Sequence, residues 1–223
     1  MKAQPKSPES TYSTAGFKAL YIEMRRDVDE LLEAGGPDDV PTPIPDPARL
    51  PPGQRRGSVR AFAAFVEGVC FSLKQLALSL APLGRLSAAE VLFCHEVDYE
   101  LDASGVPVDR PARMRTLSNL RFAFHVLNRA VGGSFKLDVA SAGWRNLCTA
   151  MKVRDRLMHP KGIASMRVSD EEIRAAVRGY RWFDAQALAL ALDIIELQLE
   201  KTSQLKGLIT DQSASGSTSD VEK

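Results

Sequence analysis

The sequence predicts an all-α protein built as a bundle of about five to six helices. Three observations predict this class. Apolar residues recur every three or four positions in several long stretches, the period of helices with one buried face. Glycine pairs and proline-rich segments separate these stretches. No stretch alternates convincingly between apolar and polar residues, so strands are not expected.

The balance of charges excludes a globally basic nucleic-acid binder. The chain of 223 residues carries 29 Lys and Arg against 28 Asp and Glu, so any RNA contact must come from a local patch. Residues 152–181 hold such a patch, because basic side chains clearly outnumber acidic ones there. The length favours one domain with a sizeable core, and 44% hydrophobic residues is ordinary for a soluble globular protein.

The cysteines predict free, buried thiols in a reducing compartment. Cys70, Cys94 and Cys148 are odd in number, far apart and within helical patterns. The first residues lack the apolar segment of a signal peptide, and no unbroken apolar run is long enough to span a membrane. We therefore expect a cytoplasmic protein that does not associate with a membrane.

The first part of the chain predicts two helices joined by a proline-rich connector. Residues 1–11 are polar and expected to be disordered, and a helix follows over residues 14–34. Residues 37–56 contain seven prolines, which exclude a helix or a central strand. We expect an extended connector there rather than a docking segment for a partner. The second helix starts after Ser58 and runs to about Leu80.

Two further helices are predicted in the middle of the chain. Ser87 and Glu90 form a capping box that opens a third helix, which we expect to continue to about Leu101. The glycine and prolines of residues 102–112 indicate a loop with room for a short hairpin. A fourth helix covers residues 112–131, and a glycine pair ends it.

The last two predicted helices hold the chemistry of the chain and its most apolar stretch. The fifth helix covers residues 139–159. A second capping box, Ser169 with Glu172, opens a sixth helix that runs to about Lys201, with a break expected near Gly179.

The sixth helix must be central or lie in an oligomer interface, because residues 185–199 are apolar on several faces. Residues 203–223 are polar and expected to be a disordered tail. In terms of organisation, we expect an N-terminal helix and connector over residues 12–56, followed by a helical domain over residues 57–202.

Arg154 stands out in the fifth helix because it falls near the middle of the apolar arc. A charge at that position faces the interior, a cleft or an interface, and it needs an anionic partner to offset desolvation. Glu67 lies at the edge of the apolar face of the second helix. It is either the carboxylate partner of Arg154 or another polar member of the site, or else an edge residue that reaches solvent, and the sequence leaves these roles open.

His159 is expected to end the fifth helix, because a residue before a proline is disfavoured in the helical conformation and Pro160 follows. The imidazole then leaves the helix frame and can swing back towards Arg154. Arginine holds a phosphodiester with two parallel hydrogen bonds, and histidine moves a proton near neutral pH. The pair therefore suits phosphate chemistry.

The segment Arg154-Asp-Arg-Leu-Met-His159 resembles the R-x4-6-H signature of HEPN domains, which are small all-α domains. Residues 143–151 look like the helix that usually carries this signature, and residues 60–68 are similar to an early helix of several such families. The resemblance covers residues 57–200. Some HEPN toxins carry a tyrosine two residues after the histidine, which a partner enzyme modifies. Lys161 stands there in this chain, so that control is not implied.

The resemblance implies a metal-independent endoribonuclease that needs no cofactor. The RNA 2′-hydroxyl would attack the adjacent phosphorus and leave a 2′,3′-cyclic phosphate. It implies a homodimer whose two motifs line one cleft, and it is compatible with a toxin or phage-defence role and an antitoxin or defence partner. The implied catalytic residues are Arg154 and His159. Asp155 and Glu67 would support them, and Arg156 and Lys161 would steer the RNA.

Two other functions stay open. One is a non-catalytic helical module that binds RNA, a nucleotide or a protein partner through Arg154. The other is a purely structural arginine, wholly enclosed by a carboxylate such as Glu67. Three arginines of the fourth helix are interpreted as a solvated face, with a phosphate-binding surface as the alternative: Arg113, Arg115 and Arg121.

A metal site is not expected. The cluster Cys94-His95-Glu96 with Asp98 offers ligand atoms, but His95 points away from the face that Cys94 and Asp98 share. No second cluster completes a coordination sphere, so we interpret these residues as structural.

Overall fold

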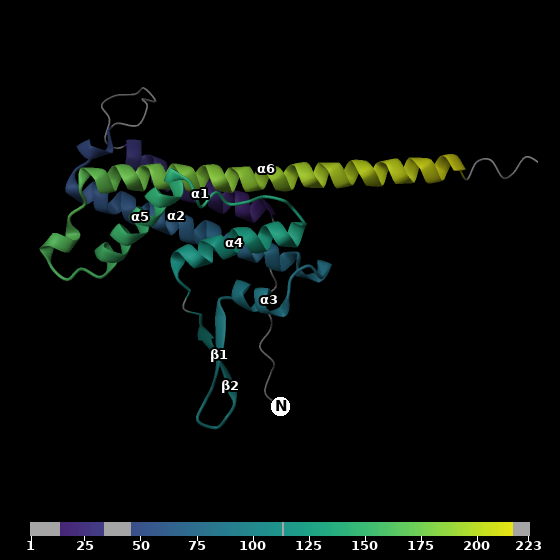
Figure 1. The fold of residues 1–223 in the computed structure, drawn as a ribbon, viewed down its shortest axis with the longest axis horizontal. Helices are drawn as coiled ribbons and strands as arrows, with labels where there is room; N and C mark the ends of the chain where they lie inside the picture. Colours follow the sequence, from purple (N-terminus) through teal and green to yellow (C-terminus); the bar gives the residue numbers. More distant parts are fainter. Residues whose placement is uncertain (1–13, 34–45, 113, 216–223) are drawn as a thin grey trace, which may run out of the picture.

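The computed structural model describes residues 14–33, 46–112 and 114–215, and this part of the chain is mostly helical (Figure 1). Six α-helices, three short 3-10 helices and one two-stranded hairpin make up the described part. The α-helices are α1 (Thr14–Glu33), α2 (Pro52–Ser79), α3 (Ala88–Cys94), α4 (Thr116–Val131), α5 (Ala142–Met158) and α6 (Asp170–Ser215). The other elements are η1 (Pro47–Arg49), η2 (Ala81–Leu83), η3 (Ile163–Met166), β1 (Val97–Leu101) and β2 (Pro107–Pro111). The helical class predicted from the sequence is confirmed.

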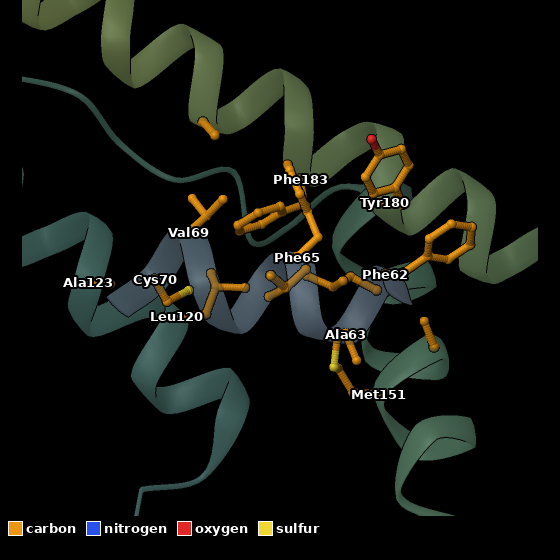
Figure 2. Packing of buried hydrophobic residues seen from close by; sticks show 14 of the residues in the cluster. Phe62, Ala63, Phe65, Val69, Cys70, Leu120, Ala123, Met151, Tyr180 and Phe183 are labelled. Carbon is orange, nitrogen blue, oxygen red and sulfur yellow. The ribbon is translucent and has the colours of Figure 1, made fainter. Parts of the chain in front are cut away.

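Helix α2 is the centre of the core, and it packs against α1, α4, α5 and α6. Figure 2 shows its aromatic side chains directed at α6. The ring of Phe62 stacks on Tyr180 with centroids 5.0 Å apart, and the edge of Phe65 meets Tyr180 and Phe183 at 5.2 and 5.8 Å. Fully burying side chains of this size contributes about 1.5–3 kcal/mol each, so this cluster holds α6 on α2.

Helices α5 and α6 approach each other closely at glycines. A Cβ atom added to Gly179 would lie 2.6 Å from the backbone nitrogen of Leu147, and one added to Gly143 would lie 2.1 Å from the ring of Trp182. Only a residue without a side chain fits at either position. The predicted break near Gly179 is therefore wrong, because this glycine serves a close helix crossing inside an unbroken α6.

The hairpin replaces the second half of the predicted third helix. That helix ends at Cys94, and Glu96 adopts a left-handed backbone with φ of 57°. Its carboxylate pairs with the ammonium of Lys74, a fully buried side chain that also donates to Asn119 Oδ1 at 2.7 Å. A buried ammonium needs these partners, which offset the strain at Glu96. The hairpin formed by β1 and β2 then projects from the bundle beside α3 (Figure 1).

Several helix ends differ from those predicted. Helix α2 begins at Pro52, seven residues earlier than predicted, because proline suits the first turn of a helix. Helix α6 continues to Ser215, beyond its predicted end near Lys201, and no proline interrupts it. Residues 1–11, most of the connector, Arg113 and residues 216–223 lie outside the described residues.

Both predicted capping boxes are present. The Glu90 backbone N–H donates to the Ser87 hydroxyl and the Glu90 carboxylate accepts from the Ser87 backbone, at the start of α3. The same reciprocal bonds join Ser169 and Glu172 at α6. Local signals of this kind depend on a few neighbouring residues, which makes them readable from sequence.

Helix α6 has two apolar faces. One packs on the core, and the other exposes an apolar stripe whose members are spaced four, three and four residues apart: Leu188, Leu192, Ile195 and Leu199. Figure 1 shows the C-terminal part of α6 running past the other helices. One face of α6 is therefore buried as expected, whereas the opposite apolar face is not covered by the described residues.

Helix α2 is long and apolar enough to cross a membrane, contrary to the expectation that no run in the chain is. Of its most apolar window, 56% is buried inside the protein, as in the core helix of a globular bundle. The burial of Phe62, Phe65 and Val66 accounts for this composition.

We predict that Gly179→Ala lowers the free energy of unfolding by about 1–3 kcal/mol, because the new methyl group would overlap the backbone of α5. Gly57→Ala is the control, since it lies in α2 and a Cβ there has nothing within 4 Å. The control should raise the stability by roughly 0.5–1 kcal/mol through helix propensity alone. Urea unfolding measures both, and equal shifts would contradict the close crossing.

Candidate functional site

Arg154 and Glu67 meet across the contact between α5 and α2. The Nη2 of Arg154 donates to Glu67 Oε1 at 2.7 Å, and its Nη1 donates to Asp155 Oδ1 at 3.1 Å. The Arg154 side chain is 26% exposed and that of Glu67 is 41% exposed. Glu67 is therefore the partner of Arg154, and its side chain also reaches solvent. The guanidinium is not wholly enclosed, as a purely structural arginine would be.

Arg154 keeps donors for a further anion. A guanidinium has five N–H groups in a fixed fork, and the two carboxylates engage only part of it. An oxyanion that binds Arg154 would compete with Glu67 and Asp155, whose carboxylates are both accessible to solvent. The carboxylates therefore hold the guanidinium in place and set the cost of phosphate binding.

His159 lies at the end of α5, outside the helical conformation, with φ of −126° and ψ of 63°. The end of α5 next to His159 matches the sequence prediction. The imidazole is exposed, and within the described residues no hydrogen bond or ion pair holds it. The backbone N–H of His159 donates to the Asp155 carbonyl at 3.1 Å, which ties His159 to the last turn of the helix.

Arg60 steadies the end of α5, a role that the sequence did not indicate. Its Nη2 donates to the Leu157 carbonyl at 3.3 Å, two residues before His159. Carbonyls of the last turn lack partners within a helix, so a donor from α2 satisfies one of them. Arg60 and Glu67 stand two turns apart on α2 and contact the same segment of α5. The sequence places both residues in the segment 60–68, which resembles an early helix of HEPN domains, but it does not indicate this contact.

Arg156 and Lys161 differ in how far their side chains are engaged in hydrogen bonds. The Nη1 and Nη2 of Arg156 donate to Glu172 at 2.8 and 2.9 Å, and Nη2 also donates to the Arg167 carbonyl at 2.6 Å. Arg156 thus joins α5 to the start of α6, and its role as an RNA contact stays a prediction. Lys161 is exposed, with its backbone N–H donating to the Ser165 hydroxyl at 3.3 Å.

The residues considered as metal ligands are used elsewhere. Cys94 is buried, and burial raises the pKa of its thiol to about 11. Glu96 pairs with Lys74, and the Asp98 carboxylate accepts from the Tyr99 backbone. Among the described residues, no group of three or more His, Cys, Asp or Glu side chains is arranged to hold a metal ion.

Comparison of the chain with family models, curated proteins and solved structures found no match. Function is therefore inferred from the residues and their geometry.

We predict that Glu172→Gln lowers stability by about 1–2 kcal/mol at pH 7, because it removes a charge-assisted pair and half of a capping box. The hydrogen bonds from Arg156 lower the pKa of Glu172 in the folded state. This stabilisation is complete above the ordinary pKa of a glutamate and is lost as the pH falls through the lowered value.

Thermal unfolding of wild type and Glu172→Gln should therefore differ most near neutral pH, and the gap should close in acid. Glu171→Gln is the matched control, an exposed neighbour in the same first turn of α6. It should shift stability by less than roughly 0.5 kcal/mol. A gap between wild type and Glu172→Gln that widens in acid would contradict the assigned pair.

Proposed function

We propose that this protein is a metal-independent endoribonuclease of HEPN type that acts on RNA in the cytoplasm. The 2′-hydroxyl of the RNA attacks the adjacent phosphorus, and the bond to the 5′-oxygen of the next nucleotide breaks. The products are a 2′,3′-cyclic phosphate and a 5′-hydroxyl. The nucleophile comes from the substrate, so the chain has to supply only charge stabilisation and proton transfer.

One observation carries this proposal. Arg154, which is held by a carboxylate and accessible to solvent, and the exposed His159 lie about one and a half helical turns apart at the end of α5. In the proposed reaction Arg154 binds the phosphate and stabilises the charge that develops on its oxygens. His159 moves the proton of the 2′-hydroxyl or of the leaving oxygen. Asp155 and Glu67 orient Arg154, and Lys161 attracts the RNA backbone.

The resemblance of residues 154–159 to the HEPN signature adds to this support. Toxin and phage-defence roles are compatible with such an enzyme, and an antitoxin or defence partner would regulate it. These roles are part of the proposal and follow from the resemblance alone.

A second candidate function rests on the same arginine. Two carboxylates face one guanidinium, so the immediate surroundings of Arg154 are net negative. That arrangement favours a non-catalytic module in which Arg154 takes up an anion of RNA, a nucleotide or a protein partner only when the carboxylates are displaced. Such a module would tolerate the loss of His159.

We predict that the purified protein cleaves total or transfer RNA in excess EDTA and leaves cyclic phosphate ends. His159→Ala should lose at least about 100-fold in rate, as expected for a general acid or base. Arg154→Gln should lose about 10²–10³-fold, as expected for a group that stabilises developing charge. Denaturing gels and end-group analysis of the products measure both effects.

His95→Ala is the control, because it removes a second exposed histidine at the end of another helix. It should cleave like wild type. Binding of RNA without cleavage, unchanged in His159→Ala, would favour the binding module. Cleavage that survives in His159→Ala would remove histidine from the mechanism.

The proposal includes a homodimer, and the exposed stripe of α6 offers an uncharged surface for it. Leucines and an isoleucine spaced four, three and four residues apart form one seam on a helix, as in paired helices. We predict that the protein sediments at twice its chain mass of 24.4 kDa. Leu192→Gln with Leu199→Gln should shift it to the monomer.

Leu101→Gln with Val106→Gln is the matched control, since both residues are exposed on the hairpin, away from the stripe. This variant should keep the sedimentation of wild type. A dimer that persists without the two α6 leucines would place the interface on another surface.

A further inference from the structure

A groove with a cationic lining runs between the start of α4 and one face of α5. Arg115, Thr116, Ser118 and Arg121 line it from α4 and the residue before it, and Lys152 lines it from α5. Asp155, the residue bonded to Arg154, belongs to this lining. The groove thus shares one residue with the candidate site.

The three cations of the groove have no acidic partner among the described residues. No ion pair within that part of the chain involves Arg115, Arg121 or Lys152, whereas most other arginines of the bundle are paired or bonded to carbonyls. Asp155 supplies the one carboxylate among the described lining residues, and it already accepts from Arg154. The groove therefore carries a local excess of positive charge in a chain that is nearly neutral overall.

The chemistry of the lining fits a sugar-phosphate backbone better than a base. The guanidinium of Arg121 covers the ring of Trp144 at 4.7 Å, and Trp144 is only 7% exposed, so no free aromatic face remains there for stacking. The cations and the hydroxyls of Thr116 and Ser118 are instead groups that contact phosphate and ribose oxygens.

The groove also lies at a suitable distance from the proposed catalyst. Lys152 and Asp155 share one face of α5, and Lys152 precedes His159 by two helical turns, roughly 10 Å along the axis. A strand whose scissile phosphate sits at Arg154 would thus have its neighbouring phosphates within reach of the groove.

We propose that this groove binds the backbone of the RNA strand on one side of the scissile phosphate, without reading its bases. The inference rests on the proposed function for the direction of the strand. The binding of a single-stranded backbone by Arg115, Arg121 and Lys152 can be tested on its own. The consequence is an enzyme whose affinity for RNA depends on salt and hardly on sequence.

The test uses a fluorescein-labelled, fully 2′-O-methylated RNA of 12 nucleotides, which lacks the attacking hydroxyl and cannot be cleaved. Fluorescence anisotropy at several salt concentrations gives the affinity and its salt dependence. Arg115→Gln with Lys152→Gln should bind on the order of tenfold more weakly at low salt. The slope of log K against log salt should fall by roughly 0.7 for each phosphate that the variant no longer neutralises.

Lys18→Gln with Arg26→Gln is the matched control. Both residues are exposed on α1, outside the groove lining and outside the basic patch of residues 152–181, and the change in net charge is the same. The control should bind like wild type. Equal losses in the two double variants would overturn the groove, and so would the absence of probe binding by wild type.

Cleavage of unmodified RNA separates this inference from the proposed function. If the groove is right, Arg115→Gln with Lys152→Gln should raise KM with little change in kcat. Groove-dependent binding without any cleavage by wild type would leave the groove standing and overturn the nuclease. Cleavage with an unchanged KM in the double variant would leave the nuclease standing and overturn the groove.

Discussion

The approach of α6 to α5 at Gly179 determines where the candidate site can lie. At this point the backbone of one helix touches the backbone of the other, so the crossing has little freedom to slide. Gly143 and Trp182 make a second close contact in the same helix pair. The end of α5 that carries Arg154 and His159 is thereby positioned by a contact that involves neither residue.

Helix α2 then gives this frame its second fixed side. Its apolar residues form the core, while Glu67 and Arg60 on the same helix reach the last turns of α5. Farther along, the buried Lys74 is bound by Glu96 and Asn119, which draws the hairpin and the start of α4 onto the bundle. One helix thus supplies the core and the polar contacts that orient the surface residues.

The features that could be predicted from the sequence are those that depend on neighbours in the chain. The helical periods, both capping boxes and the end of α5 before Pro160 are of this kind. The continuation of α6 through Gly179 could not be predicted, because the close packing against α5 outweighs the low helix propensity of glycine. The left-handed turn at Glu96 was missed for a related reason, since a partner 22 residues away supports it.

The candidate site was predictable to the same degree. The position of Arg154 in an apolar arc indicated that it needs an anion, and Glu67 was one of the residues considered. Which of these roles Glu67 has could not be decided, because the contact spans 87 residues. The pairing of Arg156 with Glu172 likewise depends on how α5 meets α6, which a single sequence does not encode in any local pattern.

The three thiols of the chain differ in exposure, and the most accessible one lies in the groove. Burial closes off Cys70 and raises its pKa to about 12, and Cys94 is enclosed in the core as well. Cys148 is only partly buried and belongs to the lining of the groove. An electrophile in solution therefore meets one thiol of this protein long before the other two. The rate at which Cys148 reacts becomes a gauge of whether the groove is empty or filled.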